Sequence, residues 1–443
     1  MKIWTATDVE SVLGECTRAI ALIDKLVQTT SSEPAEGLVA WGQYLDLEHG
    51  ANQQWGLYGT AAGTQIVSLR ARAAGHRPSA QAQVAGALRL LPEDLDHGHE
   101  LLKQKRDKDD FDNVLKLAAI AEALRPDSER IPLDNEPPIV GRLREQALGD
   151  GGWTTRPQGV EQREVRERDL ATAYVLHAWQ RYELGEEGLA ARQWLARAVL
   201  EGVPIEGNDL LALVGLAMTA HPINPNDPPQ VREAIANVHE RLSSWARSHE
   251  EIRVDRPMFS GFSVGPTTDY LFLHPEILAA LFFVRQDNSQ STRAFVIEVA
   301  EAVSSNIKAN DGLKVSNGLK ATVDQLWAFR FLCELRQLRT EGGLDSIAPP
   351  AGEQAVRERA NILWRNGKKN VGQAARLWTS KEAGYRQAAV KGFLVLVPLV
   401  LALLVAIFLF KHPAEGIGSM IVGLGVTVGV GYFFFFKEAK ERE

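Results

Sequence analysis

The stretch DLATAYVLHAW, residues 169–179, shows the feature that decides the fold, an aspartate followed by an apolar run with helical spacing. Similar starts recur along the chain: Asp112 precedes NVLKLAAIAEAL, Asp209 precedes LLALVGLAM, Asp269 precedes YLFLHPEILAALFF and Asp324 precedes QLWAFRFLCEL. The intervals between these aspartates are 57, 40, 60 and 55 residues. A recurrence of this length fits one helical hairpin per unit. With an earlier unit at residues 53–69 that lacks the aspartate, we expect about six units.

The rest of residues 1–345 agrees with this pattern. Apolar runs with helical spacing are separated by irregular loops rich in Gly, Pro and Asn. The alternation of apolar and polar residues that is typical of strands is missing. We therefore expect residues 1–345 to form one all-α domain. An unrelated α-solenoid or an irregular helical bundle remains an alternative arrangement of the same helices.

Glycine-plus-aromatic loops that lead into T-A-rich helices resemble the repeats of α/α toroids, the group of squalene and terpene cyclases and protein prenyltransferase β-subunits. The matching segments are WGLYGTAA at 55–62, GGW at 151–153 leading into ATA at 171–173, and Gly312 leading into ATVD at 321–324. The resemblance covers about residues 40–340 and its motifs are degenerate. It implies a terpenoid cyclase-like toroid in which the amino ends of the inner helices surround the mouth of a central cavity.

On this view the recurring aspartates and nearby aromatics are candidates for ligand binding at the cavity mouth. The predicted residues are Asp112, Asp169, Asp209, Asp269, Asp324, Trp55, Tyr58, Trp153, Tyr270 and Trp327. An acidic ring suits a cationic ligand or a basic segment, and aromatic faces attract cations. Helix capping is the simpler role for the aspartates, and core packing is the simpler role for the aromatics.

No catalytic motif has the sequence context that its chemistry requires. DKDD at 107–110 matches the protonating DxDD motif of terpene cyclases but lies in a charged run, where a carboxyl group would stay solvated. GFSVG at 261–265 matches the GxSxG nucleophile elbow, but it follows a poor strand, and we expect a loop between helices there. His97 and His99 have no partner cluster. We predict no catalytic residue, metal or cofactor. Whether the protein is an enzyme stays open, but the missing motifs favour a non-enzyme.

Charge and cysteine content exclude other classes. The formal net charge is -7, and no aromatic–basic pattern is present, so we expect no nucleic-acid partner. The two cysteines, Cys16 and Cys333, are too few for a disulfide framework. Residues 346–443 carry 13 basic and 7 acidic side chains, which leaves residues 1–345 strongly acidic.

The C-terminal part contains two uncharged apolar runs, 19 residues at 392–410 and 21 residues at 416–436. Each is long enough to cross a hydrocarbon core of about 30 Å as a helix. We predict a transmembrane helical hairpin at 392–436, preceded by a basic helical connector at 346–391 and followed by a short tail at 437–443. Basic residues flank the hairpin on its outer sides, so the positive-inside rule places the body, the tail and both termini in the cytoplasm, and the protein in the cytoplasmic (inner) membrane.

Small residues recur along one face of the second run: Ser419, Gly423, Thr427 and Gly431, with Gly425 and Gly429 forming a GxxxG pair. Small residues allow helices in lipid to approach closely. This face packs either on the first run of the same chain or on other copies, and we expect self-association.

These features predict a membrane-anchored recognition or sensor protein whose toroid-like body binds a ligand or protein partner. A sensing domain fused to a transmembrane hairpin resembles the membrane-acting effectors of bacterial antiviral defence against phage, an analogy of architecture only. Two alternatives remain: a membrane-associated enzyme of the terpene-cyclase or prenyl-transfer type, and a membrane-tethered scaffold.

Overall fold

The computed structural model describes residues 6–45, 55–73, 78–91, 100–101, 113–124, 131–155, 165–201, 207–221, 228–249, 251–264, 267–286, 290–315 and 318–340. The chain divides into two compact units, Met1–Ala351 and Gly352–Glu443, and all described residues belong to the first. The predicted connector, the predicted membrane hairpin and the small residues from Ser419 to Gly431 therefore lie outside the described residues. Within the described residues, no helix combines the length and the apolar character that a membrane crossing requires.

The described part of the chain is helical, as predicted, apart from one β-hairpin. Its α-helices are α1 (Ala6–Thr29), α2 (Leu57–Ala73), α3 (Pro78–Leu88), α5 (Val114–Leu124), α6 (Pro138–Glu145), α7 (Val165–Ala178), α8 (Gly185–Leu200), α9 (Asn208–Thr219), α10 (Pro229–Ser248), α11 (Pro275–Gln286), α12 (Gln290–Asn310) and α13 (Thr322–Thr340). Two short 3-10 helices, η2 (Leu133–Asn135) and η3 (Trp179–Arg181), and the strands β1 (Met258–Val264) and β2 (Thr267–Leu273) complete it.

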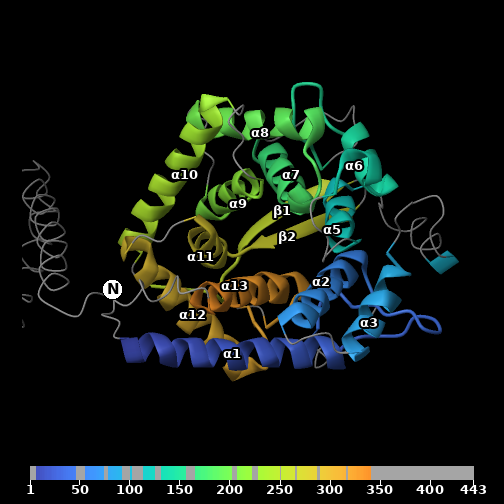
Figure 1. Ribbon diagram of the computed structural model, residues 1–443, viewed down its shortest axis with the longest axis vertical. Helices are drawn as coiled ribbons and strands as arrows, with labels where there is room; N and C mark the ends of the chain where they lie inside the picture. Colours follow the sequence, from blue (N-terminus) through green and yellow to red (C-terminus); the bar gives the residue numbers. More distant parts are fainter. Residues whose placement is uncertain are drawn as a thin grey trace, which may run out of the picture. The chain divides into compact units, whose positions relative to one another are not determined.

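Six helices form a closed inner layer (Figure 1). They contact one another in the order α2, α5, α7, α9, α11 and α13, and α13 in turn contacts α2. These helices are apolar on nearly all sides: every residue from Asp209 to Met218 in α9 and from Glu276 to Phe283 in α11 is buried. A helix that is hydrophobic all round must be enclosed by other elements. The apolar runs singled out by their aspartates therefore form most of this inner layer.

The other six helices form an outer layer, and each contacts the inner helix that it accompanies. The pairs are α2 with α3, α5 with α6, α7 with α8, α9 with α10, α11 with α12, and α13 with α1. The outer helix α10 is amphipathic, since its buried residues Val231, Ala234, Val238 and Leu242 recur every three or four positions. Such a helix covers the inner layer with one face and presents the other to solvent.

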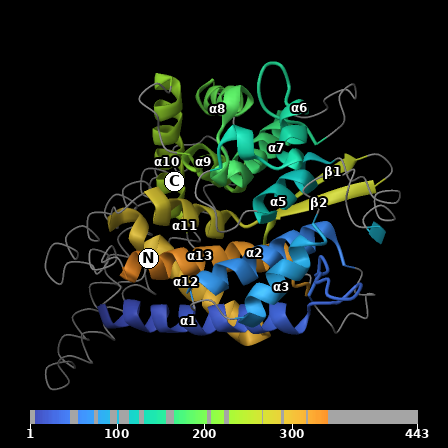
Figure 2. The same cartoon turned by 45° about the vertical axis from the view of Figure 1, so that its right-hand side comes forward.

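The first and last described helices lie together. Helix α1 lies against α12 and α13 and supplies the outer partner that α13 needs (Figure 2). Beside it, Leu45 N–H donates to the Lys320 carbonyl at 2.8 Å, and Thr322 N–H donates to the Gln43 carbonyl at 2.9 Å. The Thr322 hydroxyl also donates to the Gly42 carbonyl at 2.6 Å. Segments about 280 residues apart in sequence thus close the inner layer.

A tryptophan–threonine pair repeats at two inner helices. Thr172 Oγ1 in α7 accepts from Trp153 N–H at 3.0 Å, and Thr60 Oγ1 in α2 accepts from Trp41 N–H at 3.3 Å. In both pairs the threonine follows the tryptophan by 19 residues. Trp41, which the sequence analysis did not single out, therefore has the contact at α2 that Trp153 has at α7.

The β-hairpin corrects two expectations. Asp269 does not begin a helix: it lies on β2 opposite Phe262, and α11 begins only at Pro275. Residues 261–264 of the GFSVG motif form a strand rather than an interhelical loop, and a second strand follows where a nucleophile elbow requires a helix. Residues 258–264 and 267–273 are rich in aromatic and β-branched side chains, which favour a strand.

Candidate ligand-binding centre

The aspartates chosen from the sequence do not share one environment. Asp169, Asp209 and Asp324 lie near the amino ends of α7, α9 and α13 and are at most 3% exposed. Asp112 and the side chain of Asp269 lie outside the described residues. The three described carboxylates are thus interior groups rather than an exposed acidic rim.

Two of these carboxylates have neighbours that account for their positions. Asp169 Oδ1 accepts from Trp194 Nε1 at 3.0 Å, and burial raises the pKa of Asp169 despite this hydrogen bond. Asp324 Oδ1 lies 3.2 Å from His274 Nε2, and both side chains are buried. Each aspartate therefore joins its inner helix to a neighbouring element.

The predicted aromatics are also separated. Trp153 packs edge-on against Trp179, with ring centroids 5.0 Å apart, and donates from Nε1 to the Leu143 carbonyl, so it belongs to the packing between the layers. Trp55 and Tyr58 are partly buried and pack on the core. The side chain of Tyr270 lies outside the described residues. Of the predicted aromatics, Trp327 has a charged cluster beside it.

That cluster joins three inner helices through Glu122 of α5. Arg330 Nη2 of α13 donates to Glu122 Oε1 at 2.5 Å and to Gln65 Oε1 of α2. Gln180 Nε2, from η3 at the end of α7, donates to the same Glu122 oxygen at 2.9 Å. Gln65, Glu122 and Arg330 are at most 8% exposed. A buried ion pair needs several hydrogen bonds to offset its desolvation, and the two amide side chains provide them.

His177 and Trp327 border this ion pair with incompletely satisfied nitrogens. His177 Nδ1 lies 3.7 Å from Glu122 Oε1, beyond hydrogen-bond distance, and its ring centroid lies 5.2 Å from that of Trp327. Both side chains are 2% exposed, and among the described residues neither His177 Nε2 nor Trp327 Nε1 has a hydrogen-bond partner. Leaving such groups unpaired costs about 1–3 kcal/mol each, and a ligand that supplies partners would recover this energy.

A second ion pair joins α11 to α13. Arg285, at the carboxyl end of α11, donates from Nε and Nη2 to Glu334 of α13 at 2.7 and 2.6 Å. Arg285 and Arg330 both lower the pKa of His177, after the larger effect of burial, and His221 contributes in the same direction. Glu122 in turn raises the pKa of Arg285. Arg330 and Glu334 are four positions apart on α13 and lie on the same face of that helix, so the two ion pairs are neighbours along α13.

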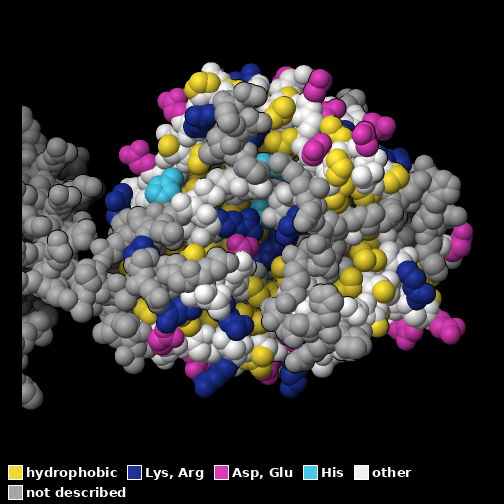
Figure 3. Space-filling model, in the orientation of Figure 1, with side chains coloured by type: hydrophobic (Ala, Val, Ile, Leu, Met, Phe, Trp, Pro, Cys, Tyr) yellow, Lys and Arg dark blue, Asp and Glu magenta, His cyan; other side chains and the backbone are white. Residues whose placement is uncertain are grey.

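The face viewed in Figure 3 is hollowed near its middle. Lys or Arg side chains gather in this hollow together with acidic and histidine side chains. Of the five ionisable residues Glu122, His177, Arg285, Arg330 and Glu334, Arg285 and Glu334 are the more exposed. We call these five residues the central cluster.

The central cluster is suited to binding a polar ligand. Arginine donates in a fixed fork that matches carboxylate and phosphate oxygens. In the described ranges, no group of three or more His, Cys, Asp or Glu side chains is placed to hold a metal ion. Burial raises the pKa of Cys16 to about 11 and that of Cys333 to about 12, so neither is a ready thiolate.

The sequence contained a signal for the central cluster that the aspartate pattern obscured. Glu122, His177 and Arg330 are ionisable residues in the interior of the apolar runs KLAAIAEAL, LATAYVLHAW and LWAFRFLCEL. An ionisable side chain in a run buried on all sides must find a partner from another run. Which runs supply the partners depends on the closed order of the inner helices.

Comparisons with known proteins leave the family open. No protein-family model, curated protein or solved structure matches this chain.

Proposed function

We propose that the body is an α/α toroid that recognises a small polar ligand at its central cluster. The closed order of six inner helices, each with an outer partner, supports the toroid interpretation. One observation carries the recognition role: the nitrogens of His177 and Trp327, buried beside the Glu122–Arg330 pair, have no partners among the described residues. A bound ligand would give these groups the contacts that no described residue supplies.

The proposed site differs from the predicted acidic mouth. The described aspartates of that mouth are buried, whereas Arg285 and Glu334 of the central cluster are 20% and 30% exposed. The central cluster is charged and extensively hydrogen-bonded, while a terpene cyclase needs an apolar pocket around its cationic intermediates. Recognition of a polar ligand is therefore favoured over the cyclase or prenyl-transfer alternative.

The second part of the proposal concerns the membrane. The apolar runs at 392–410 and 416–436 would hold the body at the cytoplasmic face of the inner membrane. Ligand binding would then control assembly of the hairpins through the small residues from Ser419 to Gly431. This is the arrangement of a membrane effector, and antiviral defence is the setting that the architecture suggests.

Two experiments test these parts separately. Native mass spectrometry of the full chain, purified in mild detergent, should show a non-covalent small molecule that is lost in Glu122→Gln. Expression of the full chain should arrest growth, and deletion of residues 392–436 should abolish this arrest and move the protein from the membrane to the soluble fraction. A bare protein in every preparation would contradict recognition, and a deletion variant that stays in the membrane fraction would contradict the anchor.

A further inference from the structure

The buried part of the central cluster forms a closed circuit of contacts with Trp327. His177 Nδ1 lies 3.7 Å from Glu122 Oε1, and Arg330 Nη2 donates to the same oxygen at 2.5 Å. The Arg330 guanidinium lies 5.3 Å from the centroid of the Trp327 ring, and the rings of Trp327 and His177 are 5.2 Å apart between centroids. His177 Nε2 and Trp327 Nε1, which lack a partner among the described residues, thus belong to adjoining rings within reach of one small molecule.

The charges beside these two nitrogens are already balanced. Glu122 is paired with Arg330, and Glu334, one turn further along α13, is paired with Arg285. The indole N–H is neutral, and burial, followed by Arg330 and Arg285, lowers the pKa of His177 well below its usual range, so the imidazole is neutral near neutral pH. A charged ligand would have to break one of the ion pairs, whereas a neutral ligand needs only to form hydrogen bonds with the two nitrogens.

The two nitrogens require opposite hydrogen-bonding partners. An indole nitrogen can only donate, so Trp327 Nε1 requires an acceptor. A neutral imidazole carries one proton, and the Glu122 carboxylate beside Nδ1 of His177 favours the proton on that nitrogen. His177 Nε2 is then an acceptor and requires a donor. A cyclic amide presents its N–H and C=O side by side on one edge, whereas a trans amide directs them to opposite sides.

From this geometry we propose that the site binds a neutral ligand by the edge of a cyclic amide, whose carbonyl accepts from Trp327 Nε1 and whose N–H donates to His177 Nε2. The inference rests on the proposed recognition function and names its ligand class. The Glu122–Arg330 pair holds the two rings in place, and Glu334, 30% exposed and one turn away on the same face of α13, marks the side of entry. Planar heterocycles such as nucleobases and saturated lactams share this edge.

Calorimetric titration of the full chain in detergent, with probes that differ by one methyl group, tests this proposal. Thymidine and caprolactam present the amide edge, and their N-methylated forms lack its N–H. We expect at least one unmethylated probe to bind at concentrations up to roughly 10 mM, and its N-methylated form to bind at least about tenfold more weakly. Binding of thymidine alone indicates a planar heterocycle, binding of caprolactam alone indicates a saturated lactam, and binding of both supports the shared edge.

Single substitutions separate the two hydrogen bonds. Trp327→Phe keeps an aromatic ring but removes the donor, so it should weaken binding about fivefold and keep the preference for the unmethylated probe. His177→Phe removes the acceptor and should abolish that preference. Trp153→Phe is the matched control: Trp153 is equally buried, but its Nε1 donates to the Leu143 carbonyl at 2.6 Å, so this variant should bind the probe like the wild type.

Thermal melting without a probe shows whether these variants fold and whether the Trp327 donor is unpaired. Removing an unpaired buried donor costs no hydrogen bond, so Trp327→Phe should melt at the wild-type temperature or above it. Trp153→Phe loses a hydrogen bond and should melt at a lower temperature. An equal decrease in both variants would show that Trp327 Nε1 is already hydrogen-bonded without a ligand, and would overturn the proposal.

Three binding results would also overturn the proposal: no binding of either unmethylated probe, equal binding of the unmethylated and N-methylated forms to the wild type, or equal binding by the wild type and Trp327→Phe. Each of these results leaves the proposed recognition function standing if native mass spectrometry still detects a bound molecule that Glu122→Gln loses. Failure of the cyclic-amide inference and failure of recognition are therefore distinguishable.

Discussion

At the residue scale, Glu276 shows how burial determines the response to pH. It lies in the first turn of α11, and its Oε1 is 3.3 Å from His249 Nε2. Burial raises the pKa of Glu276, while backbone hydrogen bonds and the two neighbouring histidines, His249 and His274, oppose this effect only in part. A carboxyl group whose pKa is higher in the folded than in the unfolded protein contributes stability at low pH and loses that contribution as pH rises through the folded pKa.

We therefore expect Glu276→Gln to gain stability relative to the wild type as pH rises from about 4 to about 7. The free energy of unfolding, measured with urea at a series of pH values, would show the two curves separating with pH. Glu251→Gln, which changes an exposed side chain, should run parallel to the wild type over the same range. Parallel curves for Glu276→Gln as well would show that this carboxyl group does not titrate differently in the folded state.

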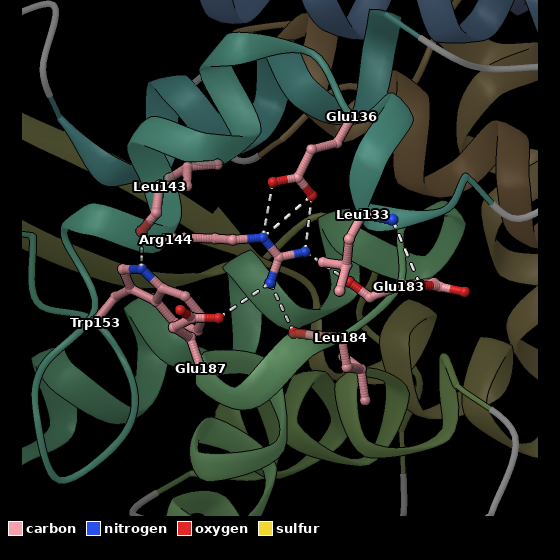
Figure 4. Close-up of polar contacts among 8 residues, drawn as sticks. All are labelled: Leu133, Glu136, Leu143, Arg144, Trp153, Glu183, Leu184 and Glu187. Atoms are coloured by element: carbon pink, nitrogen blue, oxygen red, sulfur yellow. Dashed lines mark hydrogen bonds and ion pairs between the residues drawn. The ribbon is translucent and has the colours of Figure 1, made fainter.

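At the element scale, Arg144 connects a helix to a distant loop (Figure 4). It donates from Nε and Nη2 to Glu136 at 2.8 Å, from Nη1 to the Leu184 carbonyl at 2.8 Å and from Nη2 to the Glu183 carbonyl at 2.7 Å. Its guanidinium also lies 4.6 Å from the Trp179 ring centroid. One side chain thus holds α6, η3 and the start of α8 together, with only 11% of its surface exposed.

Arg144→Lys keeps the charge but cannot reproduce the planar fork. We expect it to lower the free energy of unfolding by about 2–4 kcal/mol, because several acceptors, most of them partly buried, lose their donor. Arg253→Lys, at an exposed ion pair, should change it by less than about 0.5 kcal/mol. Urea unfolding followed by tryptophan fluorescence measures both. Equal stability of the two variants would mean that the contacts in Figure 4 contribute little.

At the scale of the described body, the closed inner layer makes the first and last helices depend on each other. Helix α1 contacts α12 and α13, and its residues Cys16, Ile23 and Val27 are fully buried. We expect deletion of residues 6–29 to abolish cooperative thermal unfolding, since α12 and α13 would expose the surface that α1 covers. A synthetic peptide of residues 6–29 added to the truncated chain should restore part of the transition. A truncated chain that melts like the wild type would contradict this dependence.

The sequence by itself determined the helical class of the body and the positions of most inner helices. Apolar periodicity is a local property, so the runs at 114–124, 208–219 and 322–340 could be recognised without knowing their neighbours. Periodicity was insufficient at YLFL, residues 270–273, because a short apolar run fits a strand as well as a helix, and the pairing of Tyr270 with Gly261 decided it.

Only the tertiary structure decided which polar residues meet. Glu122 and Arg330 are 208 positions apart, and Thr322 meets Gly42 across 280 positions. Their contacts follow from the closed order of the inner helices, which no local pattern contains. For the same reason the three described aspartates, Asp169, Asp209 and Asp324, which the sequence suggested for a cavity mouth, are buried near the starts of separate inner helices. Burial requires each ionisable side chain to have a partner, and the fold alone determines which partner is within reach.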